Sequence, residues 1–212
     1  MNLRPDVYAA QLGQDIVLLD ARRGEYFCLP DAAGAFELGG SRSARILDPD
    51  LAHDAAEMGL MGNGHVAPVR WPPKPVAGLA REPDRPLQPR EVVDGLGAFG
   101  VVLWRYYRSG FPQLLDHAVR RRRGEATALI TPDLIRQVQA FHQILPWAPF
   151  QGVCLYRSFF LLAFLRRRGL DATWVFGVQT WPFEAHCWLQ VGDVVLDDSL
   201  DHVRPFTPIL AV

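Results

Sequence analysis

The chain has 212 residues, a length that allows one large domain or two small ones. Hydrophobic residues make up 49% and charged residues 21%, as in an ordinary folded protein, and the formal net charge is −1. A chain so close to neutral has no overall field that would attract a nucleic acid or an anionic membrane surface. We therefore expect neither as a partner.

The cysteine content and the apolar runs indicate the compartment. Three widely spaced cysteines (Cys28, Cys154 and Cys187) are no disulfide framework, and no CxxC pair indicates zinc. Reduced thiols are typical of the cytosol. The first residues lack the apolar core of a secretory signal, and the longest apolar run, Phe159–Leu165, is too short to cross a bilayer. The sequence predicts a cytoplasmic protein.

The first part of the chain has the pattern of a β-meander followed by helices. Three short apolar runs, Tyr8–Leu12, Ile16–Leu19 and Tyr26–Leu29, are separated by turn residues. Helices are predicted over Ala32–Leu38 and over Pro49–Leu60, the second with Asp48 as its N-cap. This order predicts an α+β module or a winged helix at residues 1–68.

A proline-rich stretch follows this module. Its prolines include Pro72, Pro73, Pro75, Pro83 and Pro86. Proline lacks an amide donor and forces its neighbours into extended conformations, so the stretch is predicted to be neither helix interior nor central strand. We predict a semi-rigid linker at residues 69–89. A second domain then occupies residues 90–212.

The second domain begins with helices and reaches its most informative segment at Cys154. Apolar spacings of three and four predict helices over Arg90–Arg108 and Phe111–Arg123, and Thr131 is a natural N-cap for Pro132–Leu145. The residues after Cys154 are apolar nearly all round, which predicts a buried helix that ends at Gly169. Cys154 then lies in the first turn, where the positive end of the helix dipole lowers the pKa of a thiol.

Two strands after this helix supply a base and an acid. A strand is predicted over Ala172–Thr180, and Glu184–Val191 is predicted to pair with Val194–Asp198. A three-residue connection places His186 opposite Asp198, whereas a two-residue connection places Asp197 diagonally near His186. Either acid would fix the tautomer of His186 and stabilise its imidazolium form. We favour Asp198 and keep Asp197 as the alternative.

The order Cys154, His186, Asp198 resembles the transglutaminase-like, papain-related cysteine peptidases. More narrowly, VCLYRSFFLLAFLRRRGLDATWVFGV and FEAHCWLQVGDVVLDDS resemble the B proteins of lasso-peptide biosynthesis, which are leader peptidases. The family-like elements are C-L-x-R-S and H-x-W, and the usual H-A-W becomes His186-Cys187-Trp188. Because side chains alternate along a strand, Cys187 is expected on the other face from His186, buried and inert.

The segment DIVLLDARRGEYFCLPDAAGAF resembles the PqqD-like precursor recognition element, a small leader-binding domain. This resemblance implies that a leader peptide adds as an extra strand to the edge formed by Glu25, Tyr26, Phe27, Cys28 and Leu29.

Together the resemblances imply an enzyme that removes the leader from a ribosomally made lasso-peptide precursor. The Cys154 thiolate would form a thioester, and an asparagine-synthetase-like, ATP-dependent cyclase would act as the partner. No Walker or HExxH pattern indicates a cofactor or a metal in this chain. Three alternatives stay open: acyl transfer to an amine, a peptide-binding scaffold without catalysis, and a metal site built from His186, Asp197, Asp198 and His202.

Overall fold

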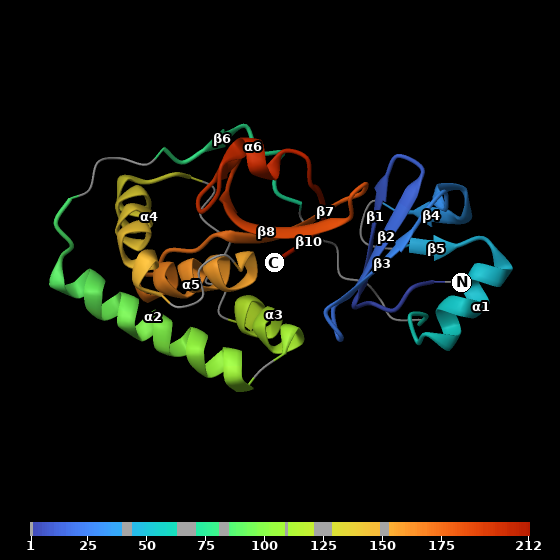
Figure 1. Cartoon of the computed structure of the whole chain (residues 1–212), viewed down its shortest axis with the longest axis horizontal. Coiled ribbons are helices and arrows are strands. Elements are labelled where there is room, and N and C mark those ends of the chain that lie inside the picture. Colours follow the sequence, from blue (N-terminus) through green and yellow to red (C-terminus); the bar gives the residue numbers. More distant parts are fainter. Residues whose placement is uncertain are drawn as a thin grey trace. The chain divides into compact units, whose positions relative to one another are not determined.

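The structure is a computed structural model that describes residues 2–39, 44–62, 71–80, 85–108, 110–120, 129–148 and 153–212 (Figure 1). The chain divides into two compact units. The first comprises Met1–Trp71, Gly177–Ala185 and Phe206–Ala211, and the second comprises Pro72–Phe176, His186–Pro205 and Val212. The domain boundaries expected from the sequence, at residues 68 and 90, stay predictions.

The first unit contains the predicted meander as an antiparallel sheet in the order β1-β2-β3, formed by β1 (Val7–Leu12), β2 (Asp15–Asp20) and β3 (Glu25–Leu29). Gly13 and Gly24 have φ values of 63° and 71° in the two turns, a conformation that glycine adopts without steric cost. All residues of the central strand β2 are buried, whereas those of β3 are exposed or half-buried. β3 is thus a terminal strand of this sheet.

The helix predicted over Ala32–Leu38 is wrong. A single 3-10 turn, η1 (Ala33–Ala35), is followed by β4 (Phe36–Leu38), which pairs with β5 (Ala44–Ile46). Gly34 weakens any helix here, and a strand buries Phe36 in the core while it exposes Glu37. A run this short carries too few apolar residues for its period to distinguish helix from strand.

The helix predicted after Asp48 is present as α1 (Pro49–Glu57). The Asp48 carboxylate accepts hydrogen bonds from the amides of Asp50 and Leu51 at 2.9 and 3.1 Å, which confirms the predicted N-cap. Ala52 and Ala55 face the hydrophobic core of the unit, against which Phe27 and Leu29 of β3 also pack. The helix ends before Gly59, whose φ of 71° stops it three residues earlier than predicted.

The second unit is built around α5 (Cys154–Arg167), the predicted buried helix, with residues Ser158–Leu162, Phe164 and Leu165 buried. It packs against α2 (Pro89–Arg108) and α4 (Pro132–Ile144), and α4 carries the predicted N-cap, a hydrogen bond from the Leu134 amide to Thr131. The other helices are α3 (Phe111–Arg120), the 3-10 turn η2 (Leu145–Trp147) and α6 (Leu200–Val203). Residues 121–123, the predicted end of the helix observed as α3, lie outside the described residues.

One sheet has the strand order β10-β7-β8-β9-β6. The strands are β7 (Thr173–Gln179), β8 (Glu184–Val191), β9 (Val194–Val195), β10 (Thr207–Ala211) and β6 (Ala77–Gly78). β6 comes from the proline-rich stretch and pairs in parallel with β9 at the edge, where proline in the flanking chain is tolerated. The sequence did not predict this strand. Within the described residues, no helix combines the length and the apolar character needed to cross a membrane.

The cap of α1 gives a test of the first unit. Asp48→Ala removes the acceptor of two amide hydrogen bonds, so we expect the free energy of unfolding of this unit to fall by about 1 kcal/mol. Urea unfolding followed by circular dichroism measures the change. Asp54→Ala, at an exposed position of the same helix, is the control and should change stability by less than about 0.5 kcal/mol. Equal effects of both substitutions would contradict the capping role.

Candidate active site

Cys154 is the first residue of α5 and is half-buried. The residue before it, Val153, is extended and is the N-cap, so Cys154 stands where the chain enters the helix, as predicted. The helix is held by its apolar side chains against α2 and α4. A nucleophile at this place has a fixed backbone and a side chain that solvent can reach.

His186 lies near the start of β8 and links Cys154 to an acid. Its Nε2 atom is 2.7 Å from Oδ2 of Asp198, and its ring also hydrogen-bonds to the Cys154 side chain. His186 is only 8% exposed. The three residues therefore form one hydrogen-bonded chain from thiol to imidazole to carboxylate, within the second unit.

The Asp198 carboxylate has partners on three elements. Besides His186, the guanidinium of Arg157 donates from Nη2 at 2.6 Å, and Nδ1 of His202 lies 3.0 Å from Oδ1. The Ser199 amide donates to Oδ1 at 2.8 Å. Burial alone would raise the pKa of Asp198, but the hydrogen bonds from His186, His202 and Ser199 and the charge of Arg157 outweigh it and hold the pKa well below its usual range.

Asp197, the alternative acid, points elsewhere. Its Oδ1 accepts a hydrogen bond from the Leu189 amide at 2.8 Å, and its Oδ2 lies 3.7 Å from Nε of Arg157. Burial raises the pKa of Asp197 to about 6, and the charge of Arg157 offsets part of this effect. Asp197 thus ties β8 to the segment that follows β9, and no hydrogen bond described for it involves His186.

The hairpin register differs from the one that favoured Asp198. Val191 pairs with Val194 and Gln190 with Val195, so the connection has two residues, Gly192 and Asp193. That register was expected to bring Asp197 to His186. The pairing stops soon after Val195, however, and the chain bends before α6. The bend, and not the register, turns Asp198 toward His186.

The charge state of the cysteine follows from its contacts. A hydrogen bond from the Cys187 thiol is the largest cause of a pKa of about 4 for Cys154, against the opposing effect of burial, and the hydrogen bond with His186 lowers it further. Burial lowers the pKa of His186, but hydrogen bonds with Asp198 and Cys154 raise it overall to about 9. At neutral pH the two side chains are a thiolate and an imidazolium, the reactive form of a cysteine nucleophile.

Cys187 is buried, as predicted, and burial raises the pKa of its thiol well above the usual value. It is nevertheless a hydrogen-bond partner of Cys154, a contact that alternation along β8 did not predict. Arg157 was missed at the site, and His202 was expected only as a possible metal ligand. Arg157 follows Cys154 by three positions on α5, a spacing that places both on one helical face. His202 follows Asp198 by four positions, across the start of α6. These spacings are the signal by which their place at the site could have been found.

His186, Asp198 and His202 also offer three donor atoms that lie within 4.8 Å of one another, a geometry that could hold a metal ion. Asp197 does not belong to this group. The guanidinium of Arg157, 2.6 Å from Asp198, already compensates the carboxylate and would repel a divalent cation. The hydrogen bonds among these side chains account for their proximity.

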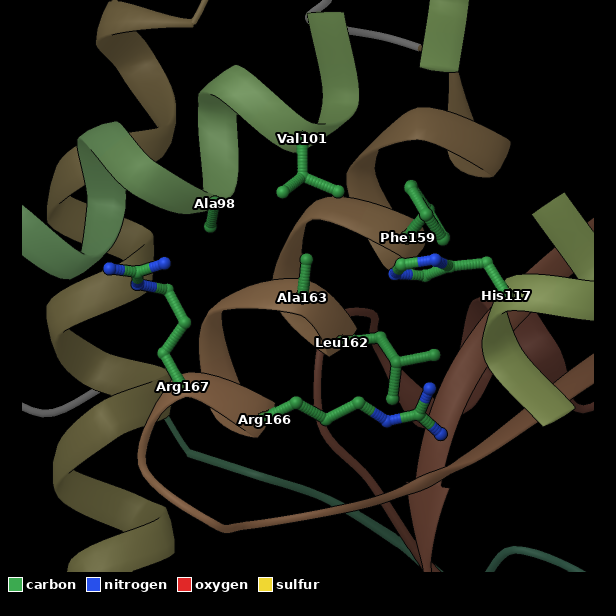
Figure 2. Close-up of a pocket in the computed structure, with 8 residues that line it drawn as sticks. All are labelled: Ala98, Val101, His117, Phe159, Leu162, Ala163, Arg166 and Arg167. Atoms are coloured by element: carbon green, nitrogen blue, oxygen red, sulfur yellow. The ribbon is translucent and has the colours of Figure 1, made fainter. Parts of the chain in front are cut away.

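Two cavities of the second unit bear on where a substrate could lie. One, of about 320 Å³ between α2, α3 and α5, is shown in Figure 2. Its two arginines are paired with acids, Arg166 with Asp171 at 2.9 Å and Arg167 with Asp94 at 3.2 Å. Another, of about 500 Å³, is lined by Arg157, Asp197 and Asp198, among others. Only this second cavity borders the hydrogen-bonded chain that contains the candidate acid.

The five residues expected to bind a leader, Glu25 to Leu29, form β3 at the end of the strand order β1-β2-β3. They belong to the first unit, whereas Cys154, His186 and Asp198 belong to the second.

One comparison with known proteins identifies the class of residues 98–211. A family model described as the transglutaminase-like superfamily matches residues 98–211, more than half of the chain. The chain is also 42% identical over 50 residues to the microcin J25-processing protein McjB of Escherichia coli, a match that spans 24% of this chain and 24% of that protein. No solved structure matches the chain. Since the family model covers more than half of its length, the chain belongs to the transglutaminase-like superfamily.

Proposed function

We propose that this protein is a cysteine endopeptidase that removes the leader from a ribosomally made lasso-peptide precursor. The observation that carries the proposal is the hydrogen-bonded chain from Cys154 through His186 to Asp198. Membership of the transglutaminase-like superfamily supports a thiol nucleophile. The similarity to a protein named for processing microcin J25 supports a precursor peptide as the substrate.

In the proposed reaction the Cys154 thiolate attacks the scissile carbonyl carbon. The His186 imidazolium gives its proton to the departing amine, which leaves a thioester on Cys154. Neutral His186 then takes a proton from water, and the resulting attack releases the leader and restores the thiolate. Asp198 holds the ring of His186 and stabilises its charged form, and Arg157 holds Asp198 in turn.

We further propose that residues 1–68 form a PqqD-like, winged-helix-like module that binds the leader, joined by residues 69–89 to a peptidase domain at residues 90–212. The leader would pair with β3, because that strand ends the order β1-β2-β3 and its side chains are exposed or half-buried. Phe27 and Leu29 pack against the core shared with α1, so the strand is rigid enough to act as a template. A separate ATP-dependent cyclase would use the freed amine, and the peptidase itself would need no cofactor or metal.

The nucleophile is tested by substitution. Cys154→Ala should abolish cleavage of the precursor peptide encoded beside the gene, because no other described thiol contacts His186 in the way that Cys154 does. Mass spectrometry of the products is the measurement. Val119→Ala, at an exposed position of α3 in the same unit, is the control and should cleave as the unchanged protein does.

The same mass spectra separate the rival functions. Incorporation of an added amine at the new carboxyl terminus would mean acyl transfer instead of hydrolysis. Cleavage that survives in Cys154→Ala would contradict the peptidase mechanism, and binding of the precursor without any thiol-dependent product would favour a scaffold.

The acid is tested by comparing two neighbouring substitutions. Asp198→Asn removes the charge that stabilises the imidazolium of His186, so we expect kcat/KM to fall by a factor of about 10² to 10⁴. Asp197→Asn keeps an oxygen for the Leu189 amide and should lower kcat/KM by less than about tenfold. A larger loss in Asp197→Asn than in Asp198→Asn would reverse the assignment.

The pH dependence tests the ion pair. Above a pH of about 4 Cys154 becomes a thiolate, and above a pH of about 9 His186 loses the proton that the leaving amine needs. The profile of kcat/KM should therefore be bell-shaped, with limbs near these two values. The rate of alkylation by iodoacetamide, followed by intact mass, reports the acidic limb alone. An alkylation rate that rises only near pH 9 would show an ordinary thiol.

A further inference from the structure

One buried hydroxyl touches both Cys154 and Cys187. Ser158 Oγ donates to the carbonyl oxygen of Cys154 at 2.7 Å and lies 3.3 Å from Sγ of Cys187. The indole Nε1–H of Trp174 donates to the same hydroxyl at 2.8 Å and fixes its orientation. Ser158 and Trp174 are fully buried and Cys187 is 2% exposed, so these hydrogen bonds are shielded from solvent. They fasten the start of α5 to β8.

The two cysteines are neighbours beside this hydroxyl, which contacts the carbonyl oxygen of one and the sulfur of the other. Cys154 accepts hydrogen bonds from both the side chain and the backbone N–H of Cys187. Both donors belong to Cys187, so the Cys154 side chain lies beside that residue. A disulfide requires this proximity, because its two Cβ atoms are only about 3.8 Å apart.

The two thiols also differ in exposure and in charge, so one of them reacts with an oxidant before the other. Cys154 is a half-buried thiolate, and peroxides react with exposed thiolates. Cys187 is buried and protonated, so it resists oxidation but can attack an oxidised neighbour. The third cysteine, Cys28, lies in the other unit, and burial raises the pKa of its thiol. Oxidation should therefore begin at Cys154.

We propose that Cys154 and Cys187 are an oxidation site, at which hydrogen peroxide converts the two thiols into a reversible disulfide that switches off the enzyme. The Cys154 thiolate attacks one oxygen of hydrogen peroxide, whose O–O bond breaks, and gives a sulfenic acid and hydroxide. The sulfur of Cys187 attacks the sulfur of Cys154, and its proton leaves with the displaced hydroxide as water. Two thiols lose two electrons in total, and one peroxide molecule gains them.

The disulfide itself does not depend on the peptidase activity, whereas its inhibitory effect rests on the proposed function. Once Cys154 is bonded to Cys187, no thiolate is left to attack a carbonyl. A dithiol reductant reverses the bond. Without Cys187 the sulfenic acid persists and is oxidised further to sulfinic acid, which such reductants do not restore.

The test uses the purified full-length protein and a small molar excess of hydrogen peroxide. We expect the intact mass to fall by two hydrogen atoms and a peptide map to join the peptides of Cys154 and Cys187. Dithiothreitol should restore the original mass and, in parallel, the cleavage of the precursor. In Cys28→Ala the loss of two hydrogen atoms and its reversal by dithiothreitol should be unchanged, because Cys28 takes no part in the disulfide.

Cys187→Ala is the decisive variant. Peroxide should add two oxygen atoms to Cys154 in this protein, which gives a sulfinic acid, and dithiothreitol should no longer restore cleavage. Oxygen addition to Cys154 in the unchanged protein, or a disulfide that involves Cys28, would overturn the proposal. Where Cys187→Ala fails to fold by circular dichroism, the mass and the peptide map of the unchanged protein still decide. A disulfide in a protein that cleaves no precursor would contradict the proposed function and leave the oxidation site intact.

Discussion

The site depends on the hydrogen bonds that the Asp198 carboxylate accepts, because they join three elements of the second unit. The oxygens of this carboxylate accept from His186 of β8, Arg157 of α5 and His202 of α6. Two cations, Arg157 and His186, face the anions Asp198 and Cys154, and the Asp197 carboxylate also lies 3.7 Å from Arg157. Buried charges are tolerated only when they are paired in this way. Removal of Asp198 alone would take a hydrogen-bonded anion away from both cations in a poorly solvated place.

The apolar helix supports this charged group mechanically. From Ser158 to Leu165 the side chains of α5 are buried almost without interruption, and they fix the helix against its neighbours. Cys154 and Arg157 occupy the first turn, where the helix meets β8. The hydrogen bond between Ser158 and Trp174 ties the same turn to β7. The first turn of α5, which carries the polar residues, is thus held rigidly because the rest of the helix is hydrophobic.

The sequence revealed those parts of the site that depend on local patterns. The helix that begins at Cys154 was predicted from its apolar residues and from Gly169 at its end, and the strand that carries His186 was predicted over Glu184–Val191, where it occurs. Contacts that depend on the path of the chain in three dimensions could not be predicted from the sequence. The choice of Asp198 rested on a register that does not occur, because the bend before α6 decides its direction. The same limit applies to Phe36, whose strand is set by a distant partner, Ile46, and not by its own short run.

Cys187 shows why strand alternation is a weak guide at such a site. Alternation states which face of β8 a side chain leaves, but Cys154 approaches from the end of a helix and contacts the backbone amide of Cys187 as well as its thiol. A thiol in that place has two opposed effects. Its S–H stabilises the thiolate of Cys154, while in the proposed oxidation its sulfur would capture an oxidised Cys154. An alanine there would remove both effects at once. If Cys154 is the proposed nucleophile, the identity of residue 187 couples its reactivity to its recovery from oxidation.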